Sequence, residues 1–176
     1  MAFAHPKKNI AELGLKDGQR VADFGAGPGH YTIPAAKAVG QDGHVYAIEI
    51  QKELVSKVET KAENAGLHNV NVIWADLEKP EGSTLDDQLV DVVIVSNVLF
   101  QITNKKQFLR EAYRVLKIGG RVLVVDWSDA HGGLGPNEKH IVSESTVRSL
   151  AEDAGFKPQQ VLEPGAHHYG IVFQKQ

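Results

Sequence analysis

The fold of this chain is constrained most by a regular alternation of short apolar runs with longer amphipathic segments. Five apolar runs follow one another, at residues 20–24, 44–50, 70–76, 90–97 and 121–127. The run at 90–97, VDVVIVSN, is apolar on both faces of a strand, as a sheet covered by helices on both sides requires. Such alternation predicts an α/β fold with a parallel, doubly wound sheet.

The segments between the apolar runs carry the residues that begin and end helices. We expect helices over residues 6–14, 29–39, 51–66 and 104–117, and a last one that Ser143 caps and Gly155 ends. Asn104 and Gln107 have the spacing of a capping box, in which each residue's side chain accepts the other's backbone N–H. Gly119 and Gly120 are expected to separate this helix from the strand at 121–127.

The end of the chain predicts a β-hairpin. Residues 157–163 and 167–175 resemble strands, and they flank the turn-forming pair Pro164–Gly165. The last strand would then run antiparallel to the others. We therefore predict a seven-stranded, Rossmann-like α/β sheet with an antiparallel last strand, in a single domain that spans residues 1–176.

Composition excludes several classes of function. The chain has 19 lysines and arginines against 22 acidic residues, so its net charge of −3 makes a nucleic-acid partner unlikely. It has no cysteine, which excludes disulfides, cysteine-ligated metals and a thiol nucleophile. Because no apolar run is long enough to cross a bilayer, we expect no membrane insertion and a cytoplasmic location. The oligomeric state cannot be predicted from these features.

Ligands of doubly wound sheets bind outside the carboxyl ends of the strands. In this sequence those ends carry acidic and amide side chains: Asp23, Glu49, Asp76, Asn97 and Asp126. Three glycines also alternate in the turn after the first strand: Gly25, Gly27 and Gly29. This edge of the sheet is therefore the predicted binding site.

The glycine-rich turn allows three interpretations. It could be a tight turn without a ligand, or part of a dinucleotide site with the pattern G-x-G-x-x-G. However, His30 stands where that pattern has its last glycine, and Pro28 lacks an N–H that could face a pyrophosphate. Asp23 and Asp76 would also repel an anionic ligand. S-adenosylmethionine fits better, because it has an ammonium, a sulfonium and a ribose diol but no phosphate.

These motifs resemble those of class I S-adenosylmethionine-dependent methyltransferases, and in particular the group that includes the quinone-biosynthesis C-methyltransferases. The resemblance covers residues 15–175 and rests on five pieces in order: VADFGAGPG, VYAIEI, WADLEKP, VDVVIVSNVLFQI and FLREAYRVLKIGGRVLVVDW. It implies the fold and the cofactor, S-adenosylmethionine, but says little about the methyl acceptor.

The resemblance also implies roles for residues in the turn and at the end of the second strand. The segment Gly25–Ala26–Gly27 would let the backbone approach the methionine part of the cofactor closely. Asp23 would stabilise the cationic end, although it could instead cap the turn. Glu49 would accept both ribose hydroxyls, unless it is only a solvated strand end. Ile50 would pack on adenine or, almost equally well, belong to the core.

At the next two strand ends, the resemblance implies that Asp76 and Leu77 recognise the adenine amino group and ring. Asn97 would close the site beneath the methionine part.

The acceptor side has fewer signals. Since the hairpin turn is expected at the ligand edge, His167, His168 and Tyr169 are the candidate catalytic residues, with His167 and Tyr169 on one face of the strand and His168 on the other. In the alternative, one histidine is solvated and Tyr169 packs under the sheet. No histidine pair has metal-ligand spacing, so we predict no metal. The glycine-rich loop 128–138 is expected to be a mobile lid.

We therefore expect methyl transfer from S-adenosylmethionine to a small or medium organic acceptor. The alternatives are an RNA or protein methyltransferase that acts with a partner, a non-catalytic S-adenosylmethionine-binding protein and, less favoured, a nicotinamide-dependent oxidoreductase. One basic stripe, Lys106–Arg110–Arg114–Lys117, has helical spacing and is more typical of a solvated helix face than of an RNA contact.

Overall fold

The computed structural model describes residues 4–130 and 135–176, in which strands and helices alternate. The strands are β1 (Arg20–Phe24), β2 (His44–Glu49), β3 (Val70–Trp74), β4 (Val90–Ser96), β5 (Leu116–Trp127), β6 (Phe156–Leu162) and β7 (His168–Lys175). The helices are α1 (Pro6–Leu13), α2 (Thr32–Ala38), α3 (Lys52–Asn64), α4 (Lys105–Val115) and α5 (Glu144–Asp153), with short 3₁₀ turns η1 (Leu99–Gln101) and η3 (Glu138–His140).

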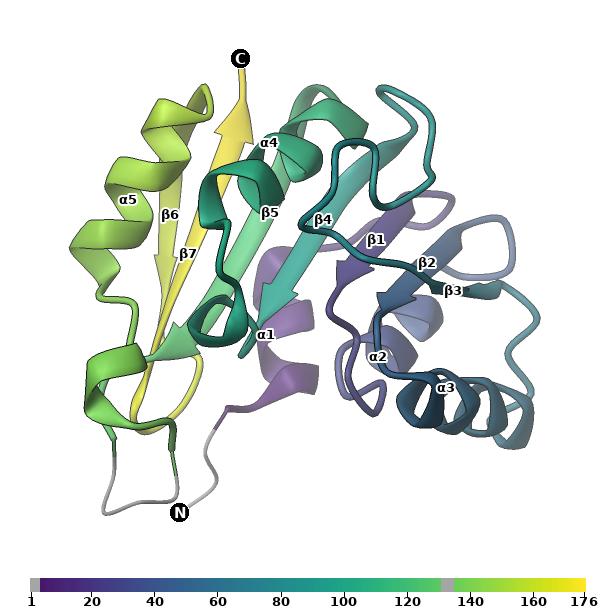
Figure 1. Cartoon of the computed structure of the whole chain (residues 1–176). Helices are drawn as coiled ribbons and strands as arrows, with labels where there is room; N and C mark the ends of the chain where they lie inside the picture. The colour runs from purple at the N-terminus through teal and green to yellow at the C-terminus, as the bar shows by residue number, and fades with distance from the viewer. Residues whose placement is uncertain (1–3, 131–134) are drawn as a thin grey trace.

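The seven strands form one sheet in the order β3-β2-β1-β4-β5-β7-β6. Strands β1 to β5 pair in parallel, and β7 is antiparallel to both β5 and β6. In Figure 1 the arrowheads of β1, β2, β4 and β5 point to one edge, while β7 points the other way. The predicted α/β fold and its antiparallel last strand are confirmed.

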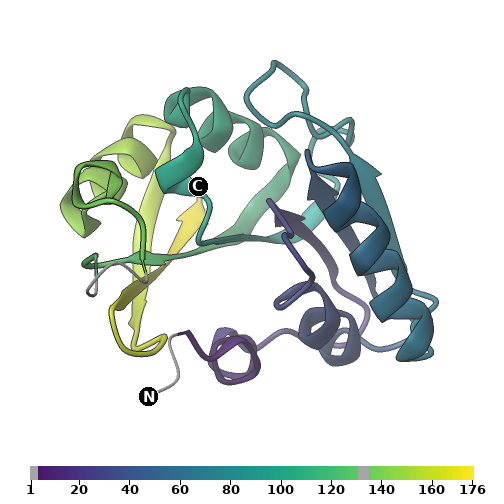
Figure 2. The same ribbon diagram turned by 60° about the horizontal axis from the view of Figure 1, so that its bottom comes forward.

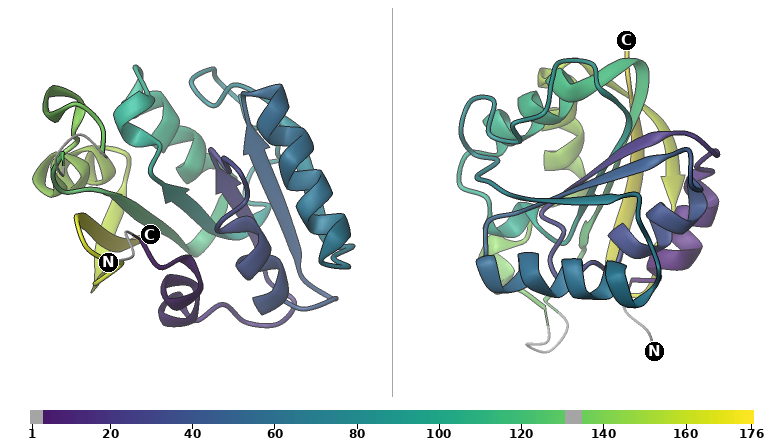
Figure 3. Two further views of the ribbon diagram at one scale, coloured as in Figure 1. Left: turned by 90° about the horizontal axis from the view of Figure 1, so that it is seen from below. Right: turned by 90° about the vertical axis from the view of Figure 1, so that its right-hand side faces the viewer.

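Two apolar clusters hold the helices on the sheet. On one face, Phe24 and Phe173 of the sheet pack in the same cluster as Phe108 of α4 and Val147 of α5. On the other face, α1 and α2 bury their apolar sides against β1, β4, β5 and β7. Figures 2 and 3 show the sheet between these two layers. Both faces are covered, as the apolar strands predicted.

Helix α4 ends earlier than the sequence predicted. Its N-cap is confirmed, because the Asn104 side chain accepts the Gln107 N–H at 3.1 Å, but the Asn104 N–H donates to Glu78 rather than to Gln107. The helix ends at Val115, and β5 begins at Leu116, so the two glycines lie within the strand. A register shift opposite Val90–Val92 accommodates them, since Gly119 takes a φ of +78° there.

Two further predictions can be compared with this fold. None of the helices that the structure describes has the length and apolar character needed to span a bilayer. The centre of the expected lid, residues 131–134, lies outside the described residues.

Candidate functional site

A cavity of about 640 Å³ opens at the carboxyl ends of β1, β2, β3 and β4. All nine residues that the sequence suggested for the cofactor line it: Asp23, Gly25, Ala26, Gly27, Glu49, Ile50, Asp76, Leu77 and Asn97. Parallel strands bring these positions together because their carboxyl ends meet at one edge of the sheet. Other lining residues had no signal in the sequence, among them Tyr31 of the turn and Gln101 and Ile102 after β4.

The backbone N–H groups of the glycine turn are already used within the protein. Gly25 and Ala26 donate to the Ile48 carbonyl at 2.9 and 3.0 Å, and Gly29 donates to the Ala26 carbonyl at 2.9 Å. Gly27 donates to Glu49 Oε2 at 2.8 Å. Pro28, which lies between Gly27 and Gly29, has no N–H. The turn from Gly25 to Gly29 therefore has no unused N–H for the pyrophosphate of a dinucleotide, unlike a phosphate-binding turn.

Two of the glycines are needed for different reasons. Both Gly25 and Gly27 adopt positive φ, +77° and +53°. A Cβ on Gly25 would lie 2.6 Å from Cγ2 of Val98, whereas a Cβ on Gly27 would meet no atom of the described residues within 4 Å. From the sequence, Gly25 is expected to be needed for close approach of the cofactor. The contact of Gly25 with Val98, the N-cap residue of η1, already requires a glycine there in the protein without ligand. Gly27 alone leaves open space next to its Cα.

Asp23 is buried at the bottom of the cavity. Its Oδ2 accepts the Thr32 hydroxyl at 2.6 Å. Burial raises the pKa of Asp23 to about 6; the Thr32 hydrogen bond lowers it and the negative charge of Glu49 raises it further. A carboxylate in this position is poorly compensated by the protein, so a cationic ligand would stabilise its ionised form.

Glu49 connects β2 to the glycine turn. Only 5 % of the residue is exposed. Its Oε2 accepts the Gly27 N–H, and its Oε1 accepts the N–H groups of Ile50 and Gln51, both at 2.9 Å. A carboxylate offers about four lone-pair sites, so three backbone donors leave about one. The carboxylate therefore shapes the cavity as well as lining it, which strand-end spacing does not reveal.

The end of β3 contributes a carboxylate and an apolar wall. Asp76 accepts the Glu78 N–H at 3.0 Å and lies 3.6 Å from the Lys79 ammonium. Leu77 is buried, whereas Ile50 is 57 % exposed. The alternative that Ile50 belongs to the core is therefore wrong, because more than half of the residue is exposed, and it is among the residues that line the cavity.

Asn97 ends β4 in a conformation that non-glycine residues rarely adopt. Its φ is +53°, and its N–H continues the sheet by donating to the Val125 carbonyl at 2.8 Å. Its side-chain Oδ1 is buried and has no hydrogen-bond donor among the described residues. An unsatisfied buried acceptor costs free energy, so it marks a place where a ligand donor would be favourable.

Asp126 supports the segment that follows Asn97. It accepts the N–H groups of Leu99 at 3.0 Å and Trp127 at 2.8 Å, and burial raises its pKa to about 6. The strand-end carboxylate therefore fixes η1 and does not appear among the residues that line the cavity.

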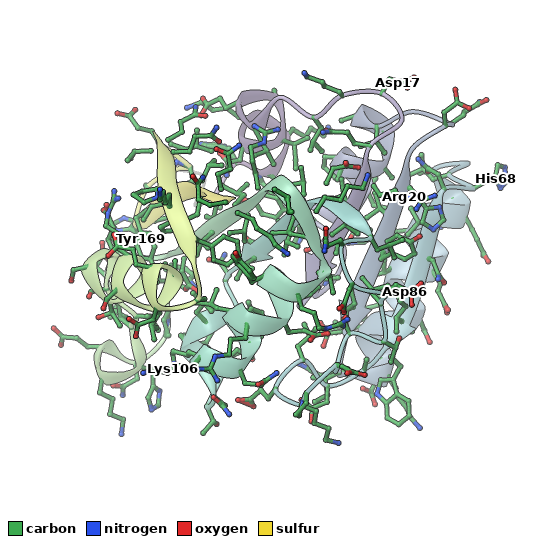
Figure 4. The ribbon with its side chains drawn as sticks, turned by 90° about the horizontal axis from the view of Figure 1, so that it is seen from above. Asp17, Arg20, His68, Asp86, Lys106 and Tyr169 are labelled. Carbon is green, nitrogen blue, oxygen red and sulfur yellow. The ribbon has the colours of Figure 1, made fainter. Side chains whose placement is uncertain are left out.

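The three candidate catalytic residues lie at the ligand edge but do not line the cavity. His168 is opposite Trp127 in the sheet and packs on its ring, with 4.3 Å between centroids. The hydroxyl of Tyr169 donates to the buried Val142 carbonyl at 2.8 Å, and burial raises its pKa. In Figure 4 Tyr169 lies beside α5.

The expected alternation over His167–Tyr169 is wrong at its first residue. His167 precedes β7 and has a φ of +61°, so alternation begins only at His168. The Nδ1 atom of His167 lies 2.9 Å from both carboxylate oxygens of Asp129.

The cavity has the charge of a site for a cation. Asp23, Glu49, Asp76 and Glu78 line it, and no lysine or arginine is among the described residues that line it. Together with Asn97 Oδ1, these groups accept hydrogen bonds. A ligand with a positive charge and several N–H or O–H donors is therefore complementary to it. S-adenosylmethionine meets this description with its ammonium, sulfonium, ribose hydroxyls and adenine amino group.

Comparison with known proteins agrees with this geometry. A family model described as "Methyltransferase domain" matches residues 15–170. The ubiquinone/menaquinone biosynthesis C-methyltransferase UbiE of Vibrio vulnificus is 34 % identical over 116 residues, or 65 % of this chain and 44 % of that protein. The chain thus spans less than half the length of the curated relatives that it matches.

Solved structures match over nearly the whole chain. A SAM-dependent methyltransferase from Aquifex aeolicus has a TM-score of 0.89 and 32 % identity, and the match covers 99 % of this chain and 91 % of that one. The [4+2]-cyclase SpnF has a TM-score of 0.81 at 17 % identity, over 96 % of this chain and 80 % of its own. The second likeness concerns the fold alone.

Proposed function

Since this chain belongs to the methyltransferase-domain family, we propose that it binds S-adenosylmethionine in the cavity at the ends of β1 to β4 and transfers its methyl group to a small or medium organic acceptor. The observation that carries this proposal is the lining of the cavity, which within residues 4–130 and 135–176 offers hydrogen-bond acceptors and negative charge but no lysine or arginine. The name of the quinone-biosynthesis relatives supports a small organic acceptor.

Each part of the cofactor has a matching group in the cavity. Asp23 and the unsatisfied Asn97 Oδ1 would hold the ammonium of the methionine part. The remaining acceptor site of Glu49 would take a ribose hydroxyl, and Asp76 would take the adenine amino group. Bound S-adenosylmethionine supplies an electrophilic methyl group. The protein would contribute chiefly by positioning donor and acceptor in line.

Two alternatives are less well supported. The used N–H groups of the glycine turn argue against a nicotinamide dinucleotide. The basic stripe argues against RNA, because three of its four cations are paired: Lys106 with Asp153, Arg114 with Asp87 and Glu111, and Lys117 with Asp91. The Lys106–Asp153 pair is exposed, as is typical of a solvated surface, whereas Arg114 is largely buried against Glu111 and is not available to RNA.

Two measurements test the function. Calorimetry should detect binding of S-adenosylmethionine and no binding of NADH; the reverse result would refute the proposal. Incubation with methyl-labelled cofactor and a metabolite extract should transfer label to a small molecule. Tight cofactor binding without any transfer, also in the presence of RNA and protein, would instead indicate a non-catalytic binding protein.

The environment of Asp23 predicts that cofactor affinity depends on pH. In the free protein the pKa of the Asp23 carboxyl is about 6, and the carboxyl must lose its proton to hold a cation. We expect affinity for S-adenosylmethionine to rise about tenfold between about pH 5 and about pH 7 and then to level off. Calorimetry over this range, at constant ionic strength, measures the effect. A flat profile would contradict it.

Two controls assign this pH dependence. In Asp23→Asn the profile should be nearly flat, which separates Asp23 from His30, another group at the cavity. The stability of the ligand-free protein should change with pH in the opposite direction to cofactor affinity. Because the folded pKa of Asp23 lies above its ordinary value of 3.8, its contribution to stability is complete below about pH 4 and is lost as pH rises through about 6.

Among the candidate catalytic residues, we propose His168 as the group that takes a proton from the acceptor, where one must be removed. Its Nδ1 lies 2.9 Å from the Ala166 carbonyl, which can only accept, so Nδ1 carries the hydrogen and Nε2 keeps its lone pair. Nε2 is buried without a hydrogen-bond partner among the described residues, and burial lowers the pKa of the ring. His168 is therefore neutral near pH 7.

This role predicts a selective loss of turnover. With an acceptor identified by label transfer, His168→Ala should lower kcat about a hundredfold while cofactor affinity stays unchanged. His167→Ala and Tyr169→Phe serve as neighbouring controls. Tyr169→Phe should mainly lower stability, by about 1–3 kcal/mol, because it leaves the buried Val142 carbonyl without its donor. Near-normal turnover of all three variants would make the hairpin purely structural.

A further inference from the structure

A second cavity, also of about 640 Å³, adjoins the acidic one and has the opposite charge. It lies between the start of α1, the start of α2 and Lys61 near the end of α3. Ala4, Pro6 and His30 line both cavities, so the two are neighbours that share a wall. We call the second cavity the basic groove. Its lining includes His5, Lys7, Lys8, His30 and Lys61 and, within the part of the chain that the structure describes, no acidic residue.

The backbone adds to this positive charge. Lys7 and Lys8 lie in the first turn of α1, which contains no acidic residue and whose N-cap residue, His5, makes no capping hydrogen bond through its side chain. The N-terminus of a helix carries partial positive charge, and acidic side chains usually compensate it. In the first turn of α1, Lys7 and Lys8 occupy positions where acidic side chains are usual. An anion at the groove would therefore be favoured by both the helix and the lysines.

The lysines keep donors for a ligand. The Lys61 ammonium spends one of its three hydrogens on the Pro28 carbonyl at 2.6 Å. Lys8 lies 3.4 Å from Glu12 and turns toward the Glu163 carbonyl. The Lys7 ammonium makes no hydrogen bond or ion pair with the part of the chain that the structure describes. Lys7 and Lys61 are thus the cations best able to hold an anion.

Apolar surface lies beside the charges. Ile33, Pro34 and Pro6 line the same groove and are each only partly buried. A purely ionic ligand would leave these side chains in water, whereas an amphipathic ligand covers them and meets the lysines at the same time. Because the groove is basic and the neighbouring cavity is acidic, the groove favours an anionic group and the cavity favours a cationic one.

We propose that the basic groove binds the anionic end, a carboxylate or phosphate, of an amphipathic methyl acceptor whose body extends past His30 toward the cofactor cavity. This inference rests on the proposed function, because it assigns the substrate class of the same site. The lysines recognise the charge, Ile33 and Pro34 contact the apolar part, and the acidic cavity repels the anionic end and so orients the molecule.

The test uses octyl phosphate as the probe and octanol as its uncharged counterpart. Binding of each is measured by calorimetry to the full chain saturated with S-adenosylhomocysteine. Octyl phosphate is expected to bind at least about tenfold more tightly than octanol, and its affinity should fall as salt is added. Equal affinities for the two probes would overturn the proposal.

A matched pair of variants locates the site. Lys7→Gln/Lys61→Gln should weaken octyl phosphate at least about tenfold. Lys16→Gln/Lys157→Gln removes the same charge at exposed positions outside the groove and should change nothing. Unchanged binding in the first variant, or an equal loss in both, would overturn the inference. Circular dichroism and the Tm of each ligand-free variant show that the fold is retained.

Two further outcomes have separate meanings. If Lys7→Gln/Lys61→Gln weakens S-adenosylmethionine as much as octyl phosphate, the groove holds the cofactor's own carboxylate and the acceptor assignment is wrong. If the unchanged protein does not bind S-adenosylmethionine at all, the proposed function fails. Cofactor binding without lysine-dependent binding of octyl phosphate would refute only the inference made here.

Discussion

Replacing Glu49 with glutamine is expected to weaken S-adenosylmethionine binding about a hundredfold. The substitution keeps the shape of the side chain but puts an NH₂ group where one carboxylate oxygen accepts a backbone N–H. At least one donor among Gly27, Ile50 and Gln51 would then face another donor. Hydrogen bonds to a charged group contribute about 1.5–3 kcal/mol each. Loss of one to the turn and one to the ribose, at the lower end of this range, is about 3 kcal/mol and gives roughly this factor.

The experiment must separate binding from folding, because Glu49 also holds the turn. Calorimetry gives the affinity, and thermal unfolding without ligand gives the change in stability, which we expect to be about 1–3 kcal/mol. The increase in Tm on adding cofactor should nearly vanish in Glu49→Gln. Glu53→Gln is the matched control, since Glu53 is exposed in the first turn of α3. Unchanged affinity in Glu49→Gln would remove Glu49 from the site.

The positions that line the cavity could be predicted because they follow from topology. Once the strands were recognised as parallel, the ends at Asp23, Glu49, Asp76 and Asn97 had to meet at one edge of the sheet. Strand identity depended only on local apolar runs bounded by glycine and polar residues. The same rule also pointed to Asp126, which does not line the cavity among the described residues. Ala26, Ile50 and Leu77 were suggested by the family resemblance and not by spacing. All nine residues suggested for the cofactor lie at the cavity.

The use that each side chain makes of its atoms could not be predicted in the same way. That Glu49 accepts three backbone N–H groups depends on the path of the turn in space. That Asp126 supports η1 depends on how β5 lies beside β4. Both carboxylates had looked equally available in the sequence. Their hydrogen-bond partners lie in other segments, and local patterns carry no information about them.

Boundaries failed where tertiary contacts outweighed local preference. The 104–117 segment has helical spacing throughout, yet Leu116 pairs with Val90 and belongs to β5. Lys117 consequently leaves the helix and pairs with Asp91. The basic groove was not predicted either. It forms between the start of α1, the start of α2 and Lys61, segments whose packing on one another no motif records.

The contact between Gly25 and Val98 leads to a second large effect. Gly25→Ala would place a methyl group 2.6 Å from Cγ2 of Val98, at a φ of +77° that alanine rarely adopts. The left-handed conformation alone costs about 1–2 kcal/mol, and relief of the overlap must move the turn or η1. Since both line the cavity, we expect stability to fall by about 3 kcal/mol and cofactor affinity to fall at least about a hundredfold.

A double-mutant cycle distinguishes the two causes. Val98→Ala removes both Cγ atoms and relieves the closest overlap, but it leaves Cβ at 3.1 Å and does not change the strained φ. Gly25→Ala/Val98→Ala should therefore recover about half of the lost stability. Gly27→Ala is the control for φ alone, because its Cβ would meet no atom within 4 Å in the described part of the chain, and it should unfold less readily than Gly25→Ala. Independent, additive effects of Gly25→Ala and Val98→Ala would show that this contact does not shape the turn. Cofactor affinity measured in the same four proteins then tests the site. If it recovers together with stability, the position of the turn against η1 limits binding, and a loss that persists would show that the cofactor itself requires the glycine.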